Sequence, residues 1–83
     1  MTPSDAAKAA DALVAEIAAR VERTGKAAMI WVQPNPRRTA EFGVVWADAV
    51  RIHGIPDRPM LSLYDRDRLI GEFPANWLSV AKA

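Results

Sequence analysis

Residues 41–54 have the sequence EFGVVWADAVRIHG, and the rest of the fold is predicted around them. This is the longest stretch with the composition of a strand, because valine, isoleucine and aromatic residues dominate it and proline is absent. Side chains alternate between the two faces of a strand. One face therefore collects large apolar side chains, and we expect it to lie against the core. Its members are Phe42, Val44, Trp46, Val50 and Ile52.

Asp48 interrupts this pattern because it falls on the apolar face. A β-bulge at Asp48 would restore the register, and a bend into two shorter strands would do the same. The opposite face is mixed in character and could meet water. It carries Glu41, Val45, Ala47, Ala49, Arg51 and His53. The segment predicts a strand over about 41–53 with one irregular position.

A helix is expected before this strand, over about residues 3–24. Gly25 follows it and can adopt the left-handed conformation that ends many helices. The apolar side chains of the helix recur at helical spacing and form one stripe. The stripe consists of Ala6, Ala10, Leu13, Val14, Ile17 and Val21. It could bind a partner, but a helix with a single apolar stripe more commonly packs on its own sheet.

Three further strands are predicted over about 27–33, 60–65 and 68–73, and a helical turn over about 75–80. Pro56 suits the second position of a type I turn. The connection after residue 65 contains no glycine, so we expect four residues around a type I turn rather than a two-residue turn. Residues 1–83 thus predict a single small α+β domain. An N-terminal amphipathic helix packs on an antiparallel sheet of three to four strands, and a short C-terminal helical turn follows.

The composition limits how such a fold is stabilised. A chain of 83 residues buries only about 60–65% of its unfolded surface, so its core is thin. There is no cysteine, and oligomerisation is the remaining common source of stability. The net charge of +1 lacks the strong positive bias of a dedicated nucleic-acid-binding protein. Charges interrupt the alanine-rich N-terminal region and no apolar run is long enough to span a bilayer, so we expect no membrane association and a cytoplasmic location.

The residue patterns do not indicate catalysis. His53 is the only histidine, and neither Ser62 nor Ser79 lies in a nucleophile-elbow sequence. The four glycines are dispersed, so there is no glycine-rich phosphate loop. We therefore expect no catalytic residue, no metal ligand and no cofactor, and the chain is not expected to be an enzyme.

Four arginines are candidates for binding a partner. Arg37 and Arg38 lie in a proline-containing loop with no acidic neighbour before Glu41, so they could hold a phosphate or a carboxylate. Arg66 and Arg68 alternate with aspartates, and they could form either a recognition edge or a solvated turn that neutralises itself.

Two tryptophans complete the set of candidate partner-binding residues. Tryptophan is often an interface anchor, but it also fills cores. We take Trp46 as a core residue, whereas Trp31 and Trp77 are the better candidates for a partly exposed contact.

The strand over 27–33 is apolar on both faces, which predicts self-association. Depending on register, its outer face carries either Ala28, Ile30 and Val32 or Met29 and Trp31. One helix covers only one face of a sheet, so the other face needs a partner. The simplest closed oligomer is a two-fold dimer, which either buries this face or pairs an edge strand.

These observations favour a small non-catalytic protein–protein interaction module. It would act as a homodimer, or as an adaptor or inhibitor of a larger protein. The alternative is a weak nucleic-acid-binding protein that uses Arg37, Arg38, Arg51, Arg66 and Arg68.

Salt dependence separates these two hypotheses. Binding to duplex nucleic acid would weaken steeply, with log K falling by about 0.9 per unit of log salt concentration for each phosphate contacted. The interaction-module hypothesis predicts no such binding near physiological salt, which fluorescence anisotropy with labelled DNA and RNA measures. A salt-sensitive, submicromolar affinity that is lost in the Arg37→Ala/Arg38→Ala variant would favour the nucleic-acid alternative.

Overall fold

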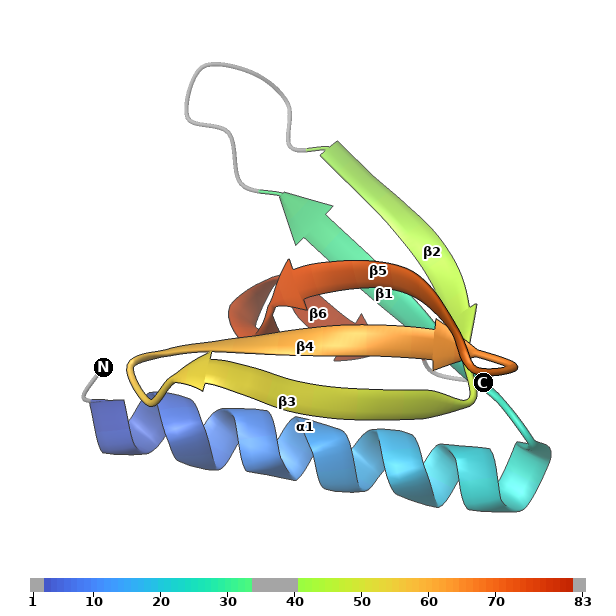
Figure 1. Ribbon diagram of the computed structural model, residues 1–83, viewed down its shortest axis with the longest axis horizontal. Coiled ribbons are helices and arrows are strands. Elements are labelled where there is room, and N and C mark those ends of the chain that lie inside the picture. The colour runs from blue at the N-terminus through green and yellow to red at the C-terminus, as the bar shows by residue number, and fades with distance from the viewer. Residues whose placement is uncertain (1–2, 34–40, 82–83) are drawn as a thin grey trace.

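The computed structural model describes residues 3–33 and 41–81, and for Pro3 and Ser4 the backbone alone. Within these residues, one helix is followed by strands and a short helical turn (Figure 1). The elements are α1 (Pro3–Thr24), β1 (Ala27–Gln33), β2 (Glu41–Ala47), β3 (Ala49–Ile55), β4 (Arg58–Asp65), β5 (Arg68–Pro74), η1 (Ala75–Trp77) and β6 (Leu78–Val80). The α+β class is confirmed. The residues of α1 match the expected helix, and Gly25 ends it with a φ of 87°.

The strands form two antiparallel sheets of three strands, not one sheet of three to four. Sheet A has the order β2-β1-β6, and sheet B has the order β3-β4-β5. The C-terminal element also differs from expectation, because only Ala75–Trp77 is helical. Leu78–Val80 pairs with β1 instead, with Leu78 opposite Trp31 and Val80 opposite Met29. This pairing provides hydrogen-bond partners for the backbone groups on the second edge of β1, and it buries Leu78. A continued helical turn would leave these backbone groups without a partner strand.

The predicted long strand divides at Asp48, so the bend is the correct alternative and the bulge is not. The Asp48 amide donates a hydrogen bond to the Tyr64 carbonyl, 2.9 Å between N and O. One Asp48 carboxylate oxygen accepts a hydrogen bond from the Arg66 amide at 3.1 Å. The residues before the bend belong to sheet A and those after it to sheet B.

The bend also reverses which side chains face the core, so the expected facing of residues 41–47 is wrong. Ala47 is fully buried and Val45 packs against the core. Phe42, Val44 and Trp46 are 74%, 56% and 58% exposed, so Trp46 is not a core residue. When a strand passes from one of two packed sheets into the other, the core lies against one face of the strand before the crossing and against the other face after it. If the alternation of inner and outer side chains is counted through Asp48 without a break, the residues on one side of Asp48 are therefore assigned to the wrong face.

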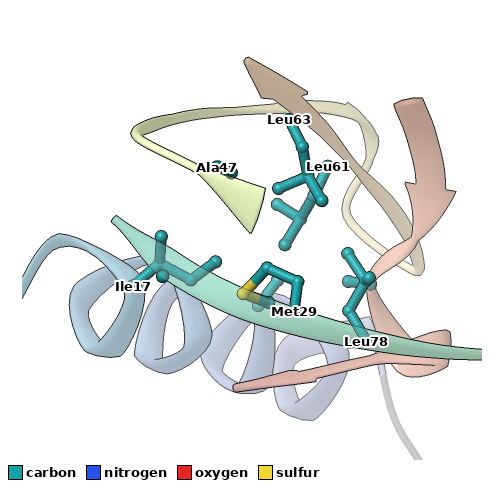
Figure 2. Packing of buried hydrophobic residues seen from close by; sticks show 9 residues of the cluster. Ile17, Met29, Ala47, Leu61, Leu63 and Leu78 are labelled. Carbon is teal, nitrogen blue, oxygen red and sulfur yellow. The ribbon is translucent and has the colours of Figure 1, made fainter. Parts of the chain in front are cut away.

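The core lies between the two sheets and α1. Figure 2 shows Ile17 of α1 approaching Met29 of β1, while Leu61 and Leu63 of β4 approach from sheet B. All four side chains are at most 1% exposed. The helical stripe thus packs on the protein's own sheets: Ala10 and Ile17 are buried, and Leu13, Val14 and Val21 pack around them.

The two hairpin turns of sheet B differ in conformation. Pro56 and Asp57 connect Ile55 to its partner Arg58, as the expected type I turn requires. The β4–β5 connection also has two residues, because Asp65 pairs with Arg68, so the expected four-residue connection is wrong. Arg66 and Asp67 have φ values of 54° and 64°, which is the type I′ geometry that follows the twist of the strands. The hydrogen bond from the Arg66 amide to Asp48 holds this turn without glycine.

The facing of the strands predicts two contrasting effects on stability. Leu61→Ala removes a fully buried side chain and should lower the free energy of unfolding by about 2–5 kcal/mol. Phe42→Ala removes a mostly exposed side chain and should change it by no more than about 0.5 kcal/mol. Urea denaturation at low protein concentration, where self-association does not contribute, measures both. Equal losses in the two variants would contradict this assignment of inner and outer faces.

Candidate protein interface

The outer face of sheet A is apolar on both β1 and β2. The strands are antiparallel, with Ala28 opposite Trp46, Ile30 opposite Val44 and Val32 opposite Phe42. Paired residues point to the same side of a sheet. We name this set of six side chains the β1–β2 face: Ala28, Ile30, Val32, Phe42, Val44 and Trp46. Of the two alternatives for the outer residues of β1, the structure selects Ala28, Ile30 and Val32, since Met29 is fully buried.

The exposed apolar area of this face is large for a chain of this size. Phe42 and Trp46 are 74% and 58% exposed. Aromatic side chains of this kind present about 150–250 Å² each, so these two alone expose about 250 Å². Val32 and Val44 add to the same patch. The largest apolar patch on a monomeric protein is about 300–600 Å² and is often functional. The β1–β2 face reaches that scale on a small domain, whereas the exposed Ile55 and Leu69 lie on sheet B.

The open edge of sheet A adjoins this face. β2 is the outermost strand, and no other described strand pairs with its second side. Soluble proteins usually protect such an edge with proline, lysine, a bulge or a covering element. β2 contains no proline and no lysine, and Glu41 is its one charged residue. The edge is therefore suited to pairing with another strand.

The two tryptophans proposed as contact residues lie elsewhere. Both Trp31 and Trp77 are half-buried. The Trp31 indole lies against Gly43, where a methyl group in place of the glycine hydrogen would come within 2.8 Å of the ring. It also stacks on Phe73, with ring centroids 5.7 Å apart and ring planes at 20°. Trp31 thus contributes to packing between the sheets, and Gly43 provides the space for its ring.

The structure does not gather the proposed arginines around Trp77. Arg66 and Arg68 are exposed at the β4–β5 turn, whereas η1 with Trp77 follows the other end of β5. Arg51 is exposed on β3. Arg37 and Arg38 lie outside the described residues.

A polar cluster of three side chains lies on sheet B. The Ser62 Oγ is 2.8 Å from His53 Nε2 and donates a hydrogen bond to Glu72 Oε1 at 3.0 Å. Because the hydroxyl proton goes to Glu72, His53 donates through Nε2–H to Ser62. A serine nucleophile needs the reverse polarity, with the imidazole accepting the hydroxyl proton. Ser62 is only 2% exposed, whereas His53 and Glu72 are exposed, so the cluster is a hydrogen-bond chain across β3, β4 and β5 at the surface of sheet B.

A second surface feature is a hollow beside the first half of α1. Its volume is about 410 Å³, and Ala6, Ala9 and Ala10 line it on the helical side. The residues 57–60 and 74–76 complete the walls. Most of this lining is apolar, and its polar residues are Asp57, Arg58 and Asn76.

Comparison with protein-family models, with curated proteins and with solved structures finds no match to this chain. Within residues 3–33 and 41–81, no helix is both long and apolar enough to cross a membrane. The same residues contain no group of three or more histidine or acidic side chains placed to hold a metal ion.

Sequence reasoning did not place Phe42 and Val44 on an exposed face, and it assigned Trp46 to the core. The pattern of exposed and buried positions on β2 becomes clear only once the bend at Asp48 is placed. One signal was present in the sequence, because Val45 and Ala47 give the opposite face of the segment an apolar end.

The placement of the three tryptophans predicts a spectroscopic result. Trp46 is the most exposed of them, so Trp46→Phe should remove most of the acrylamide-accessible fluorescence at long wavelength. Trp31→Phe should leave that component in place, because the Trp31 ring is shielded by Phe73. Quenching of the dilute protein measures the difference. An unchanged quenching constant in Trp46→Phe would mean that its indole is shielded.

Proposed function

We propose that this chain is a small non-catalytic protein–protein interaction module whose contact surface is the β1–β2 face. The observation that carries the proposal is the exposure of Phe42, Val44 and Trp46 on one strand. Three large apolar side chains at alternate positions are expensive to leave in water, at about 25 cal/mol for each Å². A partner that covers them recovers this free energy.

The chemistry of the face defines the kind of partner. None of its six side chains carries a charge, so it cannot steer or hold a phosphate backbone. Aromatic residues flanked by aliphatic ones are typical of the centre of a protein interface. The partner is therefore a protein that presents an apolar surface or an apolar strand. That protein is either a second copy of this chain or a larger protein for which this chain acts as an adaptor or inhibitor.

The inner residues indicate that the inner and outer faces of the sheets have separate roles. Met29, Leu61 and Leu63 are fully buried and form the core without the β1–β2 face. Substitutions on the face should therefore change binding and leave the fold intact. This separation makes the proposal testable by substitution.

Site-specific photo-crosslinking tests the function in living cells of the source. A benzoylphenylalanine in place of Phe42 keeps an aromatic ring at the most exposed position of the face. It should form a covalent adduct with a protein, either this chain or another, on irradiation. The matched control places the same group at Ile55, which is 58% exposed on sheet B and should give no adduct.

A competing variant completes the experiment. Trp46→Ser in the same chain should remove the adduct at position 42, because the two side chains lie on one face. If position 42 gives no adduct to any protein while the chain is folded and abundant, the β1–β2 face is not a contact surface and the proposal is wrong.

A further inference from the structure

We propose that a second copy of this chain pairs its β2 with the free edge of β2, antiparallel, with a two-fold axis at Val44. This inference rests on the proposed function, because the same strand supplies the exposed side chains. It goes beyond that function by naming a partner for the open edge of β2 and the register of the pairing. The outer faces of both copies then lie side by side on one side of the joined sheet, so this pairing covers only the flanks of Phe42, Val44 and Trp46 that face the second copy. The product is a continuous sheet of six strands in the order β6-β1-β2-β2-β1-β6.

The backbone of β2 permits this addition. β1 pairs with every residue of β2 from one side, from Glu41 opposite Gln33 to Ala47 opposite Ala27. The other side of β2 has no described partner strand. Every backbone N–H and C=O on that side must otherwise be satisfied by water. An added strand satisfies them with main-chain hydrogen bonds, as in strand-addition complexes.

The side-chain pattern of β2 is self-complementary about Val44. A two-fold axis perpendicular to the sheet keeps both outer faces on the same side. With the axis at Val44, Phe42 of each copy lies opposite Trp46 of the other copy. The two Val44 side chains meet at the centre. Aromatic cross-strand pairs are among the most favourable in antiparallel sheets. A register centred on Gly43 or Val45 would leave one of these aromatic residues without an apolar residue opposite it in β2.

The charges at the ends of β2 fit the same register. Glu41 of the second copy arrives beside Ala47, next to the bend at Asp48. The Arg66 amide binds Asp48 there, which places the β4–β5 turn with its exposed Arg66 and Arg68 at this end of the strand. Of the nearby acidic groups, Asp48 accepts a hydrogen bond from the Arg66 amide and Asp65 pairs with Lys26 at 3.1 Å, while Asp67 is exposed between the two arginines. An incoming glutamate therefore meets arginines without ion-pair partners among the described residues, and the net charge of +1 opposes association only weakly.

Cysteine cross-linking tests the register directly, because the chain has no cysteine of its own. On the axis, the two Val44 Cα atoms would be about 4.5–5.5 Å apart, as for any directly opposite pair. That distance suits a disulfide. Val44→Cys should therefore run at twice the monomer mass on a non-reducing gel after mild oxidation. Ser79→Cys is the control, because Ser79 is exposed on β6, the other edge strand of sheet A, and should stay monomeric.

Charge at the axis provides a second and independent measurement. In sedimentation equilibrium at micromolar concentration, the unmodified chain should be a dimer. Val44→Glu places two carboxylates opposite each other and should give a monomer with an unchanged circular dichroism spectrum. Val32→Glu adds the same charge to the β1–β2 face on β1, away from the axis, and should remain a dimer. A monomeric unmodified chain, a dimeric Val44→Glu variant, or a cross-link through Ser79→Cys and not Val44→Cys would each overturn the proposal.

Failure of this inference is distinguishable from failure of the proposed function. If the chain is monomeric but position 42 still cross-links to a different protein, the face is a contact surface and the second copy is not its partner. If position 42 gives no adduct at all, the function itself fails.

Discussion

The bend at Asp48 is the constraint on which the rest of the structure depends. Two hydrogen bonds fix it, one from its amide to Tyr64 and one from the Arg66 amide to its carboxylate. The bend directs one strand segment into each sheet, so the core forms between the sheets with α1 along its side. It also fixes which side chains of β2 remain outside. Burial of Ala47 and exposure of Trp46 are two results of the same change in direction.

Local sequence patterns were sufficient to predict α1, β1, β4 and β5, but not β6, the separation of β2 from β3, or how the strands are divided between the sheets. The limits of α1 and β1 follow from periodicity and from Gly25, which act within a few residues. The pairing of β6 with β1 could not be predicted locally, because it depends on residues about fifty positions apart. The type I′ turn at Arg66 and Asp67 had no glycine to indicate it, and it depends on Asp48 far earlier in the chain.

The candidate interface could be predicted only in part for the same reason. The two apolar faces of β1 indicated that one of them lacks a covering element, and the set with Ala28, Ile30 and Val32 is the uncovered one. The outer residues of β2 were misassigned because alternation was counted through Asp48 as if the strand were continuous. Asp48 itself was recognisable as irregular, but a sequence does not state on which side of such a residue the facing changes. That choice is made by Tyr64 and Arg66, which bind Asp48 from another sheet segment.

The two ends of sheet B are held with unequal strength, and this affects how the molecule opens. At one end Lys26, Asp65, Asp48 and the β4–β5 turn connect the sheets through an ion pair and hydrogen bonds. At the other end the start of α1 faces the β3–β4 turn and η1 across hollows of about 410 and 210 Å³. Local opening requires least free energy where contacts are few and backbone is exposed. We therefore expect the amide protons of α1 beside these hollows to exchange with solvent before those of the turn around the buried Ile17, while the corner at Asp48 stays closed.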